Sequence, residues 1–323
     1  NAGNSIASGG NYNVVVGDEA GTNLTTGDFN TLIGYLAGED LVGGGNNVAV
    51  GYETMKNEDG HGKNTAVGTQ ALFTLNAGAD AFNTAVGFQA GAAVTTGNNN
   101  TIIGGLAGDA VTDGTFNTFV GSNAGGALTT GDYNTFVGTG TISGTGNFGS
   151  GSLMTTGSKN TILGGYNGNQ DSLDLRTASN NVVISDGDGN IILLYRSADN
   201  TTQMQYVYSN TTSTAANVAI LSSGTIARST SSRRYKNTIN DATHGLTELL
   251  ALRPVTFKGN NDGDTVFGGL IAEEVHDAGL TEFVQYNDDD EPDALAYGNM
   301  VSLCIKAMQE QNALIEALTA RIT

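Results

Sequence analysis

Ser231 and Lys236 are the residues of this sequence whose types and spacing could do covalent chemistry. They lie five positions apart in the segment Ser-Ser-Arg-Arg-Tyr-Lys. A serine hydroxyl becomes a nucleophile when a nearby base takes its proton, and a neutral lysine amine can be that base. Because a free lysine titrates near about 10.4, the pair requires a partly desolvated site or nearby cations, and Arg233 and Arg234 lie between the two. The spacing is common by chance, so a polar linker with a solvated lysine is the alternative interpretation.

This segment separates two unlike parts of a chain of 323 residues. The part before it is repetitive and rich in Gly, Asn and Thr, and the part after it has ordinary helical patterns. The whole chain contains 47 Gly, only 2 Pro and no Trp, and its 14% of charged residues is low for a globular protein. The regular placement of Val, Ile, Leu and Phe favours structural repeats over disorder. Strict Gly-X-Y periodicity is absent, which excludes collagen.

The charge of the chain limits its partners. The net charge is −19 and no part of the sequence is basic, so we expect no nucleic-acid binding. The single cysteine, Cys304, excludes an intrachain disulfide framework. No run of about 18 apolar residues occurs, so we expect no membrane insertion. Because the sequence starts at Asn1 rather than Met, we expect a fragment or processed product with an attachment region upstream.

Histidine placement gives no reason to expect a metal or a cofactor. His61, His244 and His276 are far apart and have no partners at metal-ligand spacing. The expected set of metal ligands and cofactors is therefore none.

A five-residue motif that begins with Asn and ends with Gly recurs through residues 1–180. The spacing of its glycines is 17 residues in most steps and 19 in one step, at Gly17, Gly34, Gly51, Gly68, Gly87, Gly104, Gly121 and Gly138. Two further copies, ending at Gly151 and Gly164, follow at steps of 13 residues. A short fixed period with β-prone runs and glycine punctuation predicts a β-solenoid with one repeat per coil.

Each motif places two apolar residues side by side, such as Leu32 and Ile33. In a strand these side chains face opposite sides, so one fills the coil and the other forms an apolar stripe along the stack. Burial against copies of the same chain, closed by three-fold association, is the expected solution. We also expect the motif glycines to have positive φ and the motif asparagines to stack in a ladder, the alternative being asparagines that bind sugars or ions.

These repeats resemble the left-handed β-roll heads of trimeric autotransporter adhesins, which share an Asn-x-Ala-hydrophobic-Gly coil of slightly shorter period. The resemblance implies a trimeric, surface-exposed binding shaft. Residues 181–230 are expected to form a β-rich connector that opens with a hairpin over 181–195. Its turn, Asp-Gly-Asp-Gly-Asn at 186–190, lacks the downstream Glu of an EF-hand, so a tight turn is favoured over a Ca²⁺ site.

The C-terminal part, 231–323, ends in a helix expected over 295–323. Its apolar residues recur every three or four positions, which is the spacing of a coiled coil. The expected trimer seam consists of Tyr297, Val301, Cys304, Met308, Gln311, Ile315, Leu318 and Ile322. Gln311 is expected to fix register between chains, and Cys304 to be a small buried seam residue. Three such helices would align the chains and select one register for repeats that could otherwise slip by one coil.

Four segments of this part carry a second resemblance: residues 231–239 (SSRRYKNTI), 249–257 (LLALRPVTF), 269–280 (GLIAEEVHDAGL), and Tyr297 followed by the terminal helix. Their order and spacing resemble the endosialidase-type self-cleaving intramolecular chaperone of phage tail spikes and fibres. The resemblance implies that Ser231 attacks the Thr230–Ser231 peptide carbonyl, that Lys236 is the general base, and that the chaperone is released in a single turnover, with no activity on external substrates. Many members of that family have Asp where this chain has Ser232.

The sequence thus predicts a mainly β protein, a homotrimeric β-solenoid shaft of about 17-residue repeats followed by a small α+β chaperone with a trimeric coiled-coil helix. The expected function is host-surface attachment by a phage tail fibre or spike in the virion. Its expected partners are its own copies, a cell-surface receptor such as a glycan, and other tail proteins. The alternatives are a structural trimer that does not cleave itself and a bacterial surface adhesin.

Overall fold

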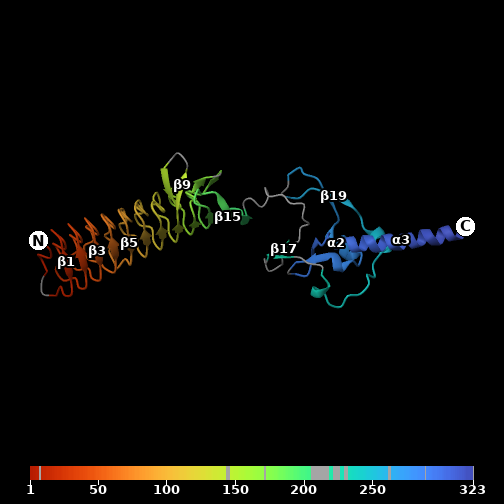
Figure 1. The fold of residues 1–323 in the computed structure, drawn as a ribbon, viewed down its shortest axis with the longest axis horizontal. Coiled ribbons are helices and arrows are strands. Elements are labelled where there is room, and N and C mark those ends of the chain that lie inside the picture. Colours follow the sequence, from red (N-terminus) through yellow and green to blue (C-terminus); the bar gives the residue numbers. More distant parts are fainter. Residues whose placement is uncertain are drawn as a thin grey trace. The chain divides into compact units, whose positions relative to one another are not determined.

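The computed structural model divides the chain into two compact units, Asn1–Ser213 and Thr214–Thr323, and each is described by itself (Figure 1). The structure describes residues 1–6, 9–142, 146–170, 172–204, 218–220, 226–228, 232–260, 263–287 and 289–322.

The first unit is a β-solenoid in which each coil contributes one short parallel strand to a common sheet (Figure 1). The parallel strands are β1 (Val14–Val16), β2 (Thr31–Ile33), β3 (Val48–Val50), β4 (Thr65–Val67), β5 (Thr84–Val86), β6 (Thr101–Ile103), β7 (Thr118–Val120), β8 (Thr135–Val137), β11 (Thr161–Leu163) and β14 (Val182–Ser185). Equivalent motif residues pair in register, for example Leu32 with Ala49. The predicted solenoid with one repeat per coil is confirmed.

The two coils of 13 residues predicted after Gly138 are wrong. Strand β11 pairs directly with β8, so a single long coil connects them, and its ladder asparagines are 26 residues apart. The additional length forms an antiparallel hairpin of β9 (Thr139–Ile142) and β10 (Gly146–Gly149). The motif copy ending at Gly151 therefore contributes no strand to the main sheet, and Gly151 instead turns with a φ of 62° against the ring of Phe136.

The beginning of the predicted connector belongs to the solenoid. Strand β14 is the last parallel strand, and β15 (Ile191–Arg196) and β16 (Thr201–Met204) extend the sheet as an antiparallel meander. The hairpin predicted over 181–195 is confirmed, and the carboxylate of Asp186 closes its turn by accepting hydrogen bonds from the N–H groups of Asp188 (3.0 Å) and Asn190 (2.9 Å). The expected boundary at residue 180 thus lies inside the first unit, which also includes a small ribbon of β12 (Asn169–Gln170) and β13 (Leu173–Asp174).

The solenoid interior is filled by the central residue of each strand, which is fully buried throughout most of the stack. These residues differ in size, from Ala66 to Phe119. The fourth residue after each motif glycine compensates for the difference. It is glycine beside a large central residue, as at Gly108, where a Cβ atom would lie 2.8 Å from the ring of Phe119. It is a large residue, Met55 or Leu72, in the two coils whose neighbouring central residues are all alanine. Large residues at the fourth position thereby fill the space that small central residues leave, which keeps the interior packed.

The motif asparagines form the predicted ladder, with the backbone as the main partner. Each side-chain Oδ1 accepts a hydrogen bond from the N–H of the next motif asparagine, as from Asn134 to Asn117 at 2.9 Å. Most Nδ2 groups donate across their own coil, as from Asn117 to the carbonyl of Gly131 at 2.8 Å, whereas Asn64 donates to the carbonyl of Gly62. The motif glycines have the predicted positive φ. At Gly34, with a φ of 137°, a Cβ atom would lie 2.2 Å from the carbonyl oxygen of Gly51. The short distance between stacked coils therefore explains why asparagine begins and glycine ends each motif.

Replacing Asn117 with alanine is expected to lower the free energy of unfolding by roughly 2–4 kcal/mol. The change leaves the buried N–H of Asn134 and the carbonyl of Gly131 without their partners, and an unsatisfied buried group costs about 1–3 kcal/mol. Denaturant unfolding of the variant measures the loss. Asn23→Ala is the matched control, since Asn23 is exposed and lies outside the ladder. Equal stabilities of the two variants would contradict the structural role of the ladder.

The second unit is small and mixed. Its strands pair as three two-stranded ribbons, β17 (Val218–Ile220) with β18 (Ile226–Arg228), β19 (Val255–Phe257) with β20 (Phe267–Gly269), and β21 (Val284–Tyr286) with β22 (Pro292–Leu295). Its helices are η1 (Arg233–Tyr235), α1 (Leu246–Ala251), α2 (Ala272–Asp277), η2 (Thr281–Phe283) and α3 (Val301–Ile322). A core of Val275, Leu280, Phe283, Val284, Met300 and Leu303 packs α2, η2, β21 and the start of α3 together.

The terminal helix begins at Val301, later than the predicted start at 295. Residues 292–295 form β22 instead, and Tyr297 lies in the turn that follows. The Tyr297 hydroxyl accepts a hydrogen bond from the N–H of Leu270 (2.8 Å) and donates one to its carbonyl (3.3 Å). The prediction of Tyr297 as a residue of the helix is therefore wrong, because its hydroxyl is held by the end of strand β20.

Candidate functional site

The predicted cleavage site, Thr230 and Ser231, lies outside the described residues, so the distance between Ser231 and Lys236 stays a prediction. The description resumes at Ser232, and the segment with Arg233 forms the short helix η1. Lys236 follows this helix and its backbone N–H donates to the carbonyl of Arg233 at 3.1 Å. The Lys236 side chain is exposed in the single chain.

Lys236 lines a shallow pocket of about 400 Å³ at the beginning of helix α3. Its other lining residues are Glu282, Phe283, Gly298, Asn299, Val301 and Ser302. The predicted general base thus lies beside the start of the helix that is predicted to align the three chains. The solvent exposure of Lys236 would therefore decrease if another chain covered the start of helix α3.

One lining residue of this pocket, Glu282, belongs to a polar pair with His244. His244 Nδ1 lies 2.7 Å from Glu282 Oε1, and this hydrogen bond with the carboxylate raises the pKa of His244. The pair could not be predicted from the sequence, because its two residues are 38 positions apart. His276 lies elsewhere on helix α2, where its Nδ1 contacts the hydroxyl of Tyr286 at 2.9 Å and its ring packs edge-on against the tyrosine.

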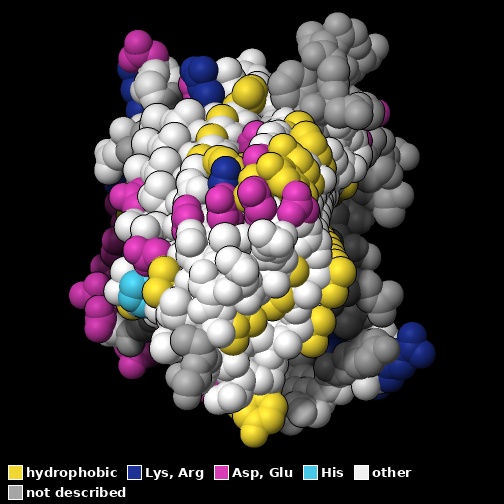
Figure 2. Space-filling model, turned by 90° about the vertical axis from the view of Figure 1, so that its left-hand side faces the viewer, with side chains coloured by type: hydrophobic (Ala, Val, Ile, Leu, Met, Phe, Trp, Pro, Cys, Tyr) yellow, Lys and Arg dark blue, Asp and Glu magenta, His cyan; other side chains and the backbone are white. Residues whose placement is uncertain are grey.

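The predicted apolar stripe is present along the outer face of the solenoid sheet. Leu32 is completely buried, whereas its neighbour Ile33 is 36% exposed. The exposed members of this column are Val16, Ile33, Val86, Ile103 and Leu163, and the half-buried members are Val50, Val67, Val120 and Val137. Seen from the N-terminal end of the solenoid, hydrophobic side chains form bands that continue from coil to coil (Figure 2). The single chain leaves these bands in contact with solvent.

Helix α3 shows the same incomplete burial. Leu303 and Ala307 are 1% exposed and face the rest of the unit. The predicted seam residues on this helix are all exposed in the single chain: Val301, Cys304, Met308, Gln311, Ile315, Leu318 and Ile322. Every residue over 311–322 is exposed. The burial expected for Cys304 therefore depends on another chain covering this face.

The sequence reasoning missed a row of exposed residues that directly precede the ladder asparagines. Aromatic rings stack here from coil to coil, Tyr12 on Phe29 at 5.0 Å and Phe116 on Tyr133 at 5.0 Å. Each of these residues has a positive φ, between 57° and 61°, which is uncommon for a bulky residue. The recurrence of Tyr or Phe directly before Asn was the signal in the sequence.

Comparisons with known proteins give no relative. No protein-family model matches the chain, and no curated protein or solved structure matches it. Among the described residues, no helix has the length and apolar character needed to cross a membrane.

Proposed function

We propose that this chain is a segment of a homotrimeric attachment fibre, in which three solenoids form a shaft and the C-terminal unit guides their assembly. The observation that carries the proposal is the apolar column Val16, Ile33, Val86, Ile103 and Leu163, which the single chain exposes along its outer sheet face. Soluble monomers rarely expose a continuous apolar patch of such extent. Copies of the same chain have the same repeat, so they can cover this column coil by coil.

Helix α3 supports the same proposal from the other unit. Its last turns have Leu314, Ile315, Leu318 and Ile322 at 56–78% exposure and make no burying contact within the chain. An isolated helix of about 12 residues is marginal in water, so packing against other helices is needed to stabilise it. A parallel trimeric coiled coil would supply this packing and fix the alignment of the chains.

An assembly element is needed because the coils share one motif and pair their strands in the same way. The strands β4 and β5 even have the same sequence, Thr-Ala-Val. Three such chains can pair in several registers of similar energy, and a coiled coil at one end selects one of them.

The family resemblance of residues 231–323 extends the proposal to chemistry and context. The Ser231 hydroxyl attacks the carbonyl of Thr230 while Lys236 takes the hydroxyl proton. The Thr230–Ser231 C–N bond breaks, the released amine takes a proton from Lys236, and water hydrolyses the remaining ester to the Thr230 carboxylate and the free Ser231 hydroxyl. Release of the element that guided assembly leaves a shaft whose unfolding is slow, because the route back through that element is lost. The resemblance also favours a phage tail fibre or spike that attaches to a host-surface component. A trimer with an inactive dyad and a bacterial surface adhesin are the alternatives.

Expression of residues 1–230 alone tests the assembly role. We expect this shorter chain to accumulate as aggregates or misaligned oligomers, whereas the full chain yields one species. Analytical ultracentrifugation of the soluble fractions measures the difference. A homogeneous trimer from residues 1–230 alone would contradict the proposed role of the C-terminal unit.

A further inference from the structure

Glu58 occupies a position that is apolar in the other regular coils. The seventh residue after the motif glycine is buried and aliphatic at Leu24, Leu41, Leu75, Val94, Val111 and Leu128, and in the coil that follows Gly51 it is Glu58. The Glu58 side chain is 0% exposed. Packing does not explain the exchange, because leucine fits the same corner in the coils on either side.

The buried carboxylate is only partly satisfied. Its Oε1 accepts a hydrogen bond from the backbone N–H of His61 at 3.0 Å. Its Oε2 is buried without a hydrogen-bond partner among the residues that the structure describes. Burial raises the pKa of Glu58, and hydrogen bonds from the backbone oppose that effect. Burying a carboxylate that lacks a compensating partner is costly, so a cation at this point would stabilise the coil.

His61 is the second exception in the same coil. The tenth residue after the motif glycine is glycine in the other regular coils, for instance Gly44 and Gly97, because a Cβ atom there would lie 2.0–2.5 Å from a carbonyl of the next coil. The coil after His61 is the one with 19 rather than 17 residues between its motif glycines. Its equivalent glycine, Gly78, has no atom within 4 Å of a Cβ position, so the longer coil leaves space at this corner.

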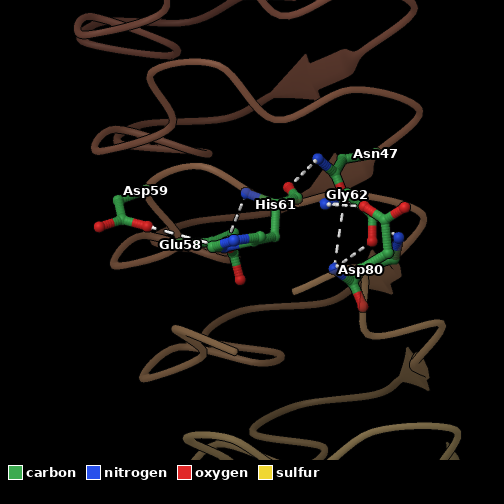
Figure 3. A network of polar contacts seen from close by, with 7 residues as sticks. Asn47, Glu58, Asp59, His61, Gly62 and Asp80 are labelled. Carbon is green, nitrogen blue, oxygen red and sulfur yellow. Dashed lines mark hydrogen bonds and ion pairs between the residues drawn. The ribbon is translucent and has the colours of Figure 1, made fainter. Parts of the chain in front are cut away.

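The side chains of Glu58, Asp59 and His61 lie close to one another (Figure 3). His61 Nδ1 lies 3.5 Å from Glu58 Oε1 and 3.9 Å from Asp59 Oδ1, and one ligand atom of each residue lies within 4.8 Å of the others. These separations exceed the 2.7–3.2 Å of an N–H···O hydrogen bond. The 3.5 Å separation falls within the roughly 3.3–3.6 Å between ligands on a tetrahedral ion with bonds of about 2.0–2.2 Å, and the 3.9 Å separation is slightly longer than that range. His61 Nδ1 is itself buried and has no hydrogen-bond partner among the described residues.

We propose that Glu58, Asp59 and His61 bind a divalent transition-metal ion, with Zn²⁺ as the representative. An imidazole nitrogen with two carboxylate oxygens suits Zn²⁺ and its neighbours, whereas Mg²⁺ and Ca²⁺ prefer oxygen ligands alone. Water completes the coordination on the side of Asp59, which is 55% exposed. The nearby Asp80 is not a ligand, because it forms an ion pair with Lys63 (2.7 Å) and accepts a hydrogen bond from the N–H of Gly62 (3.1 Å). The ion would connect these three side chains at a corner of the coil where the other coils have an apolar contact.

The test is a titration of the chelator-treated full chain with Zn²⁺, followed by calorimetry and by thermal unfolding. We expect one ion per chain and a rise in Tm. Glu58→Leu restores the residue of the neighbouring coils, so we expect it to fold, to lower the Zn²⁺ affinity at least 100-fold, and to have a higher Tm than the wild type in the presence of chelator. Asp59→Asn changes an exposed side chain and is expected to lower the affinity at least tenfold without changing the metal-free Tm.

His244→Gln is the matched control, because His244 also lies beside a carboxylate, that of Glu282, outside the proposed site. Its Zn²⁺ affinity is expected to equal that of the wild type. The proposal is overturned if the wild type binds no Zn²⁺, if Glu58→Leu binds it as tightly as the wild type, or if His244→Gln abolishes binding.

Discussion

Replacing Ser231 with alanine is expected to keep the chain at its full length of 323 residues on a denaturing gel, where the wild type gives fragments of 230 and 93 residues. Without the hydroxyl no acyl intermediate forms, so we expect cleavage to fall below detection rather than to slow down. Lys236→Ala is expected to give the same result, since the hydroxyl proton then has no acceptor. Mass spectrometry of the denatured chain locates the cut bond.

Ser232→Ala is the matched control for this experiment, because it removes a neighbouring hydroxyl and leaves the proposed dyad intact. We expect it to be cleaved like the wild type. Loss of cleavage in Ser232→Ala with normal cleavage in Ser231→Ala would show that the nucleophile is misassigned. An intact wild-type chain would remove the protease activity and leave the assembly role in place.

Replacing Ile103 with aspartate is expected to convert the proposed trimer into monomers. Ile103 belongs to the apolar column and is 39% exposed in the single chain, so a carboxylate there disturbs the isolated solenoid little. In a trimer closed over this column, three carboxylates would be buried close together without partners. The cost is on the order of several kcal/mol for each copy. Light scattering coupled to size exclusion, applied to the Ser231→Ala background, measures the assembled mass.

Thr96→Asp is the control for Ile103→Asp, because it adds the same charge to an exposed turn outside the apolar column. We expect it to remain trimeric. Trimers of unchanged stability in Ile103→Asp would show that the column faces solvent in the assembly and that another surface joins the chains.

The periodic features of the solenoid were predictable because each is repeated in every coil. The period located the strands, the adjacent pair Leu32 and Ile33 predicted one buried and one exposed column, and the motif asparagines predicted a ladder. Stacking repeats the same contact in every coil. A residue pattern that predicts a contact weakly in one coil therefore predicts it strongly when it recurs in many coils.

Departures from the period were harder to interpret. The repeated Asn-to-Gly pattern that ends at Gly151 suggested one more coil, but its residues belong to a hairpin and a turn, which only the pairing of β8 with β11 reveals. The cluster around Glu58 and His61 was not predicted, because a polar residue at position 58 is unusual only when compared with the buried aliphatic residues at the equivalent position of the other coils. Tyr297 fitted a heptad pattern although its hydroxyl is held by Leu270, a contact between residues 27 positions apart.

The proposed cleavage site was predictable only by resemblance. A serine and a lysine five residues apart carry little information by themselves, and the structure adds the pocket of Lys236 and Glu282 but not the position of Ser231. The surroundings that would desolvate Lys236 are supplied by the assembled chains in this account.

The solution mass of the purified Ser231→Ala chain shows whether three copies assemble. Three copies of the 33.0 kDa chain correspond to about 99 kDa, which is the mass that this account predicts at micromolar concentration. A folded species of 33.0 kDa would contradict it, since the apolar column and the exposed face of α3 would then be stable in water without any partner.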